Sequence, residues 1–132
     1  MTETAKMGWV IVYVPDVESA IAFYEKAFGL ARKFIAPDAS FAELDTGETK
    51  LSFASEQMGE SNFEGGFQRP SGGQPFNVEV ALIFDDVEAA FARALDNGGS
   101  PLVEPHRKPW GQMVGYVRDP FGTLVELATP VD

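Results

Sequence analysis

The residues that could carry chemistry in this 132-residue chain are mostly carboxylates and aromatic rings. The sequence has twenty Asp and Glu against ten Lys and Arg, with two Trp, three Tyr, one histidine and no cysteine. Without cysteine the chain cannot build a disulfide, a thiolate zinc site, an iron–sulfur cluster or a cysteine nucleophile. With only one histidine, it cannot supply two or three imidazole ligands to a metal. Acid–base work and ligand stacking are the chemistries left open.

The single histidine, His106, does not point to a site by itself. It lies in the segment Glu104-Pro105-His106-Arg107-Lys108-Pro109, which is basic and bracketed by prolines. We therefore expect His106 in a solvated loop. Ligation or catalysis by His106 is the alternative and needs a partner group within hydrogen-bond reach. The sequence assigns His106 no role.

Composition and charge exclude several classes of partner. A net charge of -10 argues against nucleic-acid binding, because neutralising phosphates needs a basic face. Hydrophobic residues make up 45% of the chain, which is typical of a globular domain. No apolar run is long enough to cross a bilayer, and the first six residues do not resemble a signal peptide. We expect a cytoplasmic protein that contacts neither membrane nor nucleic acid.

An internal repeat organises the chain. A shift of 70 residues aligns VIVYVPDVESAIAFYEKAFG with VALIFDDVEAAFARALDNGG, and the shift becomes 74 near the ends of the two halves. Each half has the pattern of a strand, a helix and three further strands. Asp16 and either Asp85 or Asp86 are the expected N-caps of the two helices, and Gly29 is the expected C-terminal stop of the first.

The expected elements alternate in type in the same way in both halves. The first half has strands at 8–14, 33–35, 40–44 and 50–54 and a helix at 17–28; the second half has strands at 78–84, 102–104, 112–118 and 123–128 and a helix at 87–95. We place module one at about 7–56, a Gly-rich linker at 57–76 and module two at about 77–130, all within one domain, 1–132. Phe63 and Phe67 in the linker favour a segment that folds over something, and a mobile connector is the alternative.

The ordered set of short motifs resembles the vicinal oxygen chelate superfamily, which includes glyoxalase I, extradiol dioxygenases and bleomycin resistance proteins. The motifs are Val14-Pro15-Asp16-Val17, Phe28-Gly29-Leu30, Asp85-Asp86-Val87, Pro109-Trp110-Gly111 and Asp119-Pro120-Phe121-Gly122. The resemblance covers about residues 7–130. It implies an α+β fold of two tandem β-α-β-β-β modules, whose mixed sheets curl into half-barrels with helices outside and a central cavity.

Strand alternation then sorts the residues of the first strand into two faces. Val10, Val12 and Val14 are uniformly β-branched and should lie under the helix. Trp9 and Tyr13 should face the cavity. By the repeat, Glu79 should do the same in the second half.

The resemblance also implies four metal positions, on the first and last strand of each module. In this sequence they hold Trp9, Ser52, Glu79 and Glu126. The indole N–H of Trp is only a donor, and Ser is a poor neutral ligand. We therefore expect no transition metal and no cofactor. A hard divalent ion such as Mg²⁺, held by Glu79 and Glu126 with waters, is the alternative.

Glu79 and Glu126 are the candidate catalytic residues. If both point inward, each raises the pKa of the other, and partial burial acts in the same direction. Such a pair could hold a cationic group or act as acid and base. The alternative is a structural role, in a salt bridge or a hydrogen bond to Tyr, Arg118 or backbone.

The remaining site candidates are side chains expected near the cavity. The candidates for ligand binding are Trp9, Tyr13, Phe41, Glu43, Ser52, Trp110 and Tyr116. Trp9 would offer a stacking wall to a planar or cationic ligand, or else would fill the core. Trp110 is a candidate for a second wall.

Two classes of function follow from the resemblance. The preferred one is a bleomycin-resistance-like protein that binds a small cationic or planar ligand without a catalytic transition metal. The alternative is an enzyme, either a metal-dependent or metal-free lyase or isomerase that uses Glu79 and Glu126, or a dioxygenase. The sequence leaves enzyme and binding protein open, and it does not identify the ligand. We expect a homodimer, since the family usually pairs such chains and half-barrels leave edges to cover.

Overall fold

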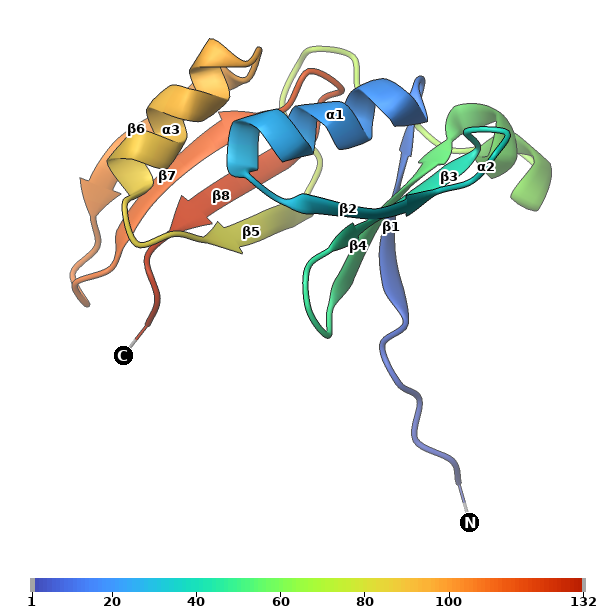
Figure 1. Ribbon diagram of the computed structural model, residues 1–132, viewed down its shortest axis with the longest axis horizontal. Coiled ribbons are helices and arrows are strands. Elements are labelled where there is room, and N and C mark those ends of the chain that lie inside the picture. The colour runs from blue at the N-terminus through green and yellow to red at the C-terminus, as the bar shows by residue number, and fades with distance from the viewer. Residues whose placement is uncertain (1, 132) are drawn as a thin grey trace. The chain divides into compact units, whose positions relative to one another are not determined.

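The first half of the chain forms one four-stranded mixed sheet with a helix against one face (Figure 1). In the computed structural model, which describes residues 2–131, strand β1 runs parallel to β4, and β3 lies antiparallel to both β4 and β2. The strand order is β1-β4-β3-β2. Its elements are β1 (Trp9–Val14), α1 (Val17–Phe28), β2 (Ala31–Ile35), β3 (Phe41–Asp45) and β4 (Lys50–Ser55).

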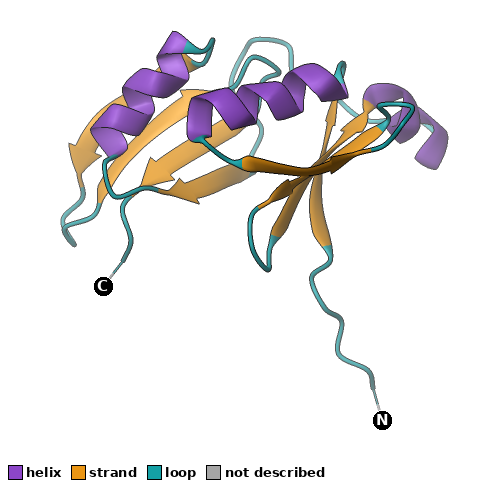
Figure 2. Cartoon of the chain, viewed as in Figure 1, coloured by secondary structure: helices purple, strands orange, loops and turns teal. Residues whose placement is uncertain are grey.

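The second half repeats this topology with the strand order β5-β8-β7-β6 (Figure 2). Its elements are β5 (Glu79–Ile83), α3 (Val87–Asp96), β6 (Ser100–Arg107), β7 (Met113–Arg118) and β8 (Leu124–Ala128). The chain divides into two compact units at Phe67, and the last turn of α1, Lys26–Phe28, is grouped with the second unit. The predicted α+β fold with two tandem β-α-β-β-β modules and unclosed sheets is confirmed.

Side-chain caps fix where the two long helices begin and end. The Asp16 carboxylate accepts the Ser19 N–H at 3.3 Å, and the Asp86 carboxylate accepts the Ala89 N–H at 3.0 Å. Of the two aspartates considered for the second helix, Asp86 is the N-cap. Gly29 ends α1 in the left-handed conformation, with φ of 72°, which a residue without Cβ adopts at little cost.

Each sheet has one covered face and one open face. In the first sheet Val12 pairs with Phe53, whose ring lies 4.9 Å from that of Tyr24 on α1, so the β-branched face of β1 lies under the helix as predicted. The opposite side, which we call the first open face, carries Trp9, Ile11, Tyr13, Phe41, Glu43 and Ser52. In the second sheet α3 packs on β6, β7 and β8. Its other side, the second open face, carries Glu79, Ala81, Ile83, Tyr116, Arg118 and Glu126.

The predicted linker is not a loop throughout. Its first part forms helix α2 (Glu56–Asn62), whose N-cap Ser55 accepts the Met58 N–H at 3.1 Å. Beyond α2, Phe67 stacks on Tyr13 with ring centroids 5.1 Å apart, and Phe63 meets the same ring edge-on at 6.3 Å. This part of the linker folds over the end of β1. A Cβ at Gly59 would lie 2.7 Å from the Phe67 ring, so a glycine lets α2 approach this closely.

The prediction that His106 lies in a loop is wrong. Strand β6 continues to Arg107, and His106 pairs with Val114 of β7. Pro105 does not end the strand, because β6 is an edge strand and its register shifts between Val103 and His106. Proline is tolerated at sheet edges and bulges, where its missing N–H is not needed. The His106 Nδ1 lies 3.0 Å from the Glu104 carbonyl oxygen.

Among the helices within residues 2–131, none combines the length and apolar character that a membrane span requires.

Candidate functional site

The second open face brings Glu79 and Glu126 together. Glu79 opens β5 and Glu126 lies in the middle of β8, which runs parallel beside it with Ala81 opposite Glu126. The two carboxyl groups are hydrogen-bonded, so one of them carries a proton. This bond, partial burial and the charge of Glu126 together raise the pKa of Glu79 from 4.5 to about 7.

Tyr116 donates a hydrogen bond to one of the two glutamates. It lies opposite Glu126 on β7, and its hydroxyl donates to Glu126 Oε1 at 2.9 Å. Burial, followed by the bond to Glu126, raises the pKa of Tyr116 to about 12, so the phenol stays a donor near neutral pH. The carboxyl group of the pair whose pKa is raised is that of Glu79.

In the first sheet the corresponding positions hold Trp9 and Ser52, and a permanent anion, Glu43, lies beside them. The indole Nε1 of Trp9 donates to Glu43 Oε1 at 2.9 Å, and the Lys33 Nζ lies 3.4 Å from Glu43 Oε2. The bond from Trp9, assisted by Lys33, holds the pKa of Glu43 below its usual range although the side chain is buried. Unlike the Glu79–Glu126 pair, Glu43 does not share its charge with a proton.

Trp9 is a surface residue and not a core residue. Its side chain is 51% exposed on the first open face, and the Lys50 ammonium lies 5.3 Å from its ring centroid. One face of the indole thus already contacts a cation. Next to it, Ser52 is fully buried, and its hydroxyl has no hydrogen-bond partner among residues 2–131.

Tyr13 and Phe41 lie on the same open face, and neither is freely accessible along its whole ring. Phe67 and Phe63 cover Tyr13, and Asn62 Nδ2 donates to the Tyr13 hydroxyl at 3.3 Å. Phe41 packs against Phe34 at 6.0 Å. The first sheet thus gathers five of the seven predicted ligand-binding residues on one side: Trp9, Tyr13, Phe41, Glu43 and Ser52.

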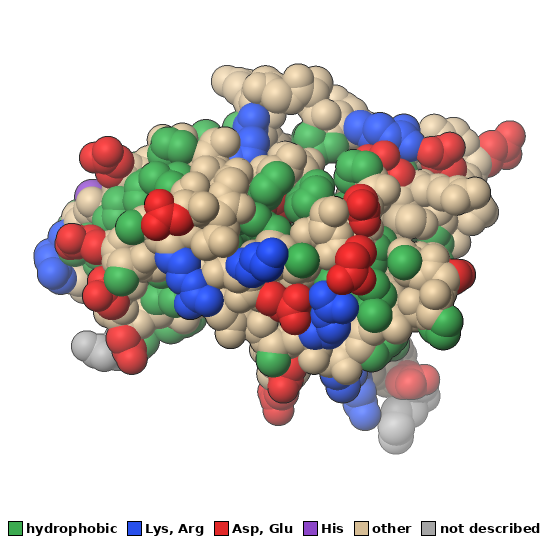
Figure 3. All heavy atoms as spheres, turned by 45° about the horizontal axis from the view of Figure 1, so that its top comes forward, with side chains coloured by type: hydrophobic (Ala, Val, Ile, Leu, Met, Phe, Trp, Pro, Cys, Tyr) green, Lys and Arg blue, Asp and Glu red, His purple; other side chains and the backbone are tan. Residues whose placement is uncertain are grey.

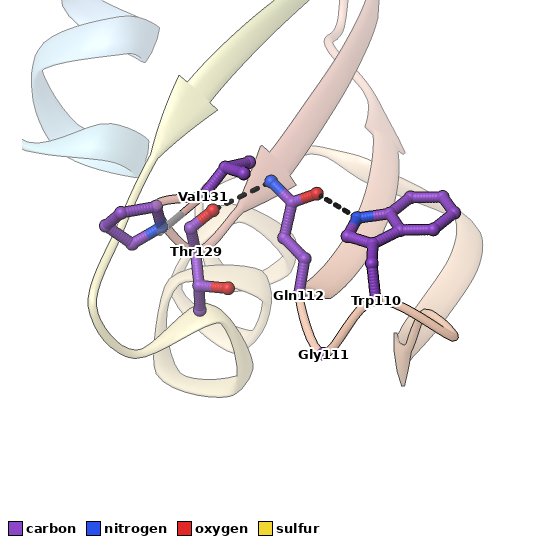
Figure 4. Close-up of a pocket in the computed structure, with 6 residues that line it drawn as sticks. Trp110, Gly111, Gln112, Thr129 and Val131 are labelled. Carbon is purple, nitrogen blue, oxygen red and sulfur yellow. Dashed lines mark hydrogen bonds between the residues drawn. The ribbon is translucent and has the colours of Figure 1, made fainter.

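Trp110 belongs to a different pocket from the carboxylate pair. It lies in the β6–β7 turn, 65% exposed, and its Nε1 donates to Gln112 Oε1 at 2.8 Å. Gln112 Nε2 donates in turn to the Thr129 carbonyl oxygen (Figure 4). These residues line a hollow of about 460 Å³ with Pro130 and Val131. Neither Tyr116 nor the two glutamates lines this hollow.

Sequence reasoning missed a second pocket in the same unit, of about 420 Å³. Arg118, which the sequence suggested only as a partner for the glutamates, lines this pocket with Ser100, Leu102 and the linker residue Pro70. The linker and the Pro120-Phe121-Gly122 turn form this pocket together. No pattern in the sequence relates these two segments, so the sequence carried no signal for the pocket.

The donor set does not fit a transition metal. Within residues 2–131, no three His, Cys, Asp or Glu side chains converge on a point where an ion could bind. The Trp9 N–H is committed to Glu43, and Glu79 and Glu126 are bonded to each other. Zinc, nickel and iron sites in proteins normally include imidazole or thiolate ligands, which these positions lack.

The excess negative charge is not concentrated on the face that Figure 3 shows. Acidic, basic and apolar side chains are interspersed there, although the chain carries a net charge of -10. The acidic side chains of this face are separate groups and not one continuous acidic patch.

Comparison with known proteins gives a consistent family. The profile of the Glyoxalase/Bleomycin resistance protein/Dioxygenase superfamily matches residues 6–127. Protein Mb0911c of Mycobacterium bovis is 31% identical over 122 residues, which cover 89% of this chain and 79% of that protein. YraH of Bacillus subtilis is 28% identical over 130 residues, which cover 92% of this chain and 96% of YraH. The crystal structure of a glyoxalase-related enzyme from Fulvimarina pelagi superposes with a TM-score of 0.82 at 21% identity, over 96% of this chain and 89% of that one.

Proposed function

The chain belongs to the Glyoxalase/Bleomycin resistance protein/Dioxygenase superfamily, and we propose that within it this protein binds a small cationic ligand without a transition metal. The observation that carries the proposal is the hydrogen-bonded pair of Glu79 and Glu126 on an open sheet face, with Tyr116 donating to Glu126. Two carboxyl groups held this closely favour a positive charge between them. In the free protein that charge is a proton.

An ammonium or guanidinium group is the natural competitor for this proton. A bound cation would interact with both carboxylates and would remove the repulsion that raises the pKa of Glu79. Tyr116 would keep its bond to Glu126 and so hold that carboxylate in place. Binding should therefore release a proton below about pH 7 and release little or none well above it.

The first open face, in the other unit, offers a planar cationic group a surface of its own. The indole of Trp9 is half exposed, and the fixed charge of Glu43 lies at its edge. A flat, cationic group stacked on Trp9 would exchange the Lys50 ammonium for its own charge. This supports the preference for a ligand that is both planar and cationic.

We also propose that the protein acts as a homodimer. Large apolar side chains stand exposed on the open faces of both sheets, including Ile11 at 42% and Ile83 at 60%. Exposed apolar faces of this kind mark interaction surfaces. A second copy of the chain offers the same two faces and can cover them by symmetry.

The proposal is tested by calorimetric titration with a metal-free cationic glycopeptide of the bleomycin type, at pH 6 and pH 8. We expect the glycopeptide to bind the wild type at both pH values. Binding should release a proton from the protein to the buffer at pH 6 only. Glu79→Gln and Glu126→Gln should each weaken binding by about tenfold or more. Glu104→Gln makes the same charge change on an exposed residue of the same sheet and should leave binding unchanged. Binding that ignores both site variants would overturn the proposal.

A second candidate function is metal-free acid–base catalysis, which the pKa of Glu79 favours. A carboxyl group that titrates at about 7 is suited to exchange protons with a carbon next to a carbonyl. Deuterium incorporation into dihydroxyacetone in D₂O, followed by NMR, tests it. The rate should rise with pH through about 7 and fall at least tenfold in Glu79→Gln. Incorporation at the uncatalysed rate would exclude this activity for the probe.

A further inference from the structure

The pocket at the Arg118 end of strand β7 lies in the same unit as the carboxylate site. Its walls are Ser100 and Leu102 on β6, Arg118 at the end of β7, the turn 119–122 and two linker residues, Pro70 and Gly72. It measures about 420 Å³, which is room for a small organic group. Every one of these residues belongs to the second unit.

Arg118 carries a donor that the protein itself does not use. Its Nε is buried, and it has no hydrogen-bond partner among residues 2–131. A buried N–H on a charged group is costly to leave unpaired, and native structures seldom do so. The Nε edge of a guanidinium offers two parallel N–H groups, which match the two oxygens of a carboxylate.

Strand register places this donor next to the glutamate pair. Arg118 lies opposite Leu124, which lies opposite Glu79, while Tyr116 and Glu126 form the neighbouring row. Cross-strand partners share a face, so Arg118 is on the second open face with both glutamates. Diagonal neighbours in such rows are about 7–8 Å apart, a distance that one short ligand can span.

The linker forms a wall of the pocket through a contact that needs a glycine. Pro70 packs directly on Gly122, where φ is +101° and any Cβ would overlap the Pro70 ring. Asp119 also lines the pocket, but its Oδ1 accepts the N–H groups of Phe121 and Thr123, both at 2.9 Å. These two bonds hold the Oδ1 atom of Asp119 in the turn.

We propose that this pocket binds a carboxylate through the guanidinium of Arg118, whose Nε lacks a partner among residues 2–131, with the hydroxyl of Ser100 as a further donor. This inference rests on the proposed function of the Glu79–Glu126 site. Together, the cationic site and the carboxylate pocket predict that the ligand is a zwitterion. It carries an ammonium group for Glu79 and Glu126 and a carboxylate for Arg118, separated by a short chain.

The experiment follows the side-chain Nε–Hε signals of arginine by ¹H–¹⁵N NMR during four titrations of the full chain. The probes are acetate, ethylammonium, γ-aminobutyrate and inorganic phosphate. We expect acetate to shift the Arg118 signal and to leave that of Arg107 unchanged, because Arg107 is exposed and donates to the Gly111 carbonyl oxygen in the β6–β7 turn. γ-Aminobutyrate should bind about tenfold more tightly than ethylammonium. That advantage should disappear in Arg118→Gln and persist in Arg107→Gln.

The outcomes separate the two proposals. If ethylammonium fails to bind while acetate still shifts Arg118, the cationic site is wrong and the carboxylate pocket stands. If acetate leaves Arg118 unchanged, or phosphate alone shifts it, the carboxylate pocket is overturned. The acetate titration of the wild type needs no variant, so a folding defect in Arg118→Gln would not obscure the result.

Discussion

Glu79 and Glu126, 47 positions apart in the sequence, lie on adjacent parallel strands with their carboxyl groups hydrogen-bonded to each other. Tyr116 binds only one of them, so the pair is asymmetric. The pKa of Glu79 is raised to about 7, so Glu79 titrates near neutral pH. This asymmetry gives the site its pH dependence.

Replacing Glu79 by glutamine should change the pH dependence of stability. The pKa of Glu79 is about 7 in the folded protein against an ordinary 4.5, so the folded state binds an extra proton between these values. The contribution of Glu79 to the free energy of unfolding therefore falls as pH rises from about 4.5 to about 7, and it levels off above pH 7. Glu79→Gln should flatten this slope and gain about 1 kcal/mol at pH 8, a value reduced for solvent screening.

Urea unfolding at pH 5, 6, 7 and 8 measures the effect, with Glu104→Gln as the control of equal charge. A wild-type stability that stays constant or rises between pH 5 and 7, after subtraction of the control, would contradict the shared proton.

Removing the hydroxyl of Tyr116 should act on the glutamates more than on the fold. In Tyr116→Phe the Glu126 side chain loses its donor, so the pair should hold its proton more tightly and the titration midpoint of Glu79 should rise above about 7. The lost hydrogen bond should cost about 1 kcal/mol of stability. Titration of the side-chain ¹³Cδ signals by NMR checks this. An unchanged midpoint of Glu79 would show that the phenol does not act on the pair.

Trp9→Phe should disturb Glu43 and leave the second sheet unaffected. Glu43 is buried and would keep only Lys33 as a partner, so its pKa should rise. Loss of the Trp9 hydrogen bond to this buried carboxylate should reduce stability by about 1–3 kcal/mol. Thermal unfolding of Trp9→Phe, Glu43→Gln and the double variant measures the coupling. Additive effects would mean that the Trp9–Glu43 bond contributes nothing, and Trp110→Phe serves as the aromatic control.

Gly59→Ala tests the aromatic packing between the linker and β1. Alanine in an unhindered helix position is about 1 kcal/mol more stable than glycine. Here the added Cβ would lie 2.7 Å from Phe67 and 3.0 Å from Tyr13, so the sign should reverse to a loss of about 1–2 kcal/mol. Gly8→Ala, with open space around its Cβ, is the control. If Gly59→Ala is more stable than the wild type, α2 does not pack against Phe67 and Tyr13 at this distance.

Most of the fold follows from the sequence because its determinants are local or repeated. The caps at Asp16 and Gly29 act within one turn of their own helix. The repeat transferred the assignment of the first strand to the second half, and it placed Glu79 on the open face. Proximity of Glu79 and Glu126 followed from the family positions once the strand order was known.

What the sequence could not predict depends on contacts between distant segments. Strand β6 reaches His106 because its place at the sheet edge tolerates Pro105, and edge position is a property of the whole sheet. Helix α2 lies in a segment whose composition favours a loop, and it packs on β1 and β4. The pocket at Arg118 exists because Pro70 meets Gly122, a contact 52 residues apart that no local pattern indicates.

The most direct test of the account is the ¹³Cδ titration of Glu79, measured in the free protein and again with a saturating cationic ligand. We predict a midpoint of about 7 for the free protein and a clear fall when the ligand is bound, because the ligand's charge replaces the proton. A midpoint near the ordinary value of 4.5 that does not move on ligand addition would contradict the carboxylate pair as a cation site.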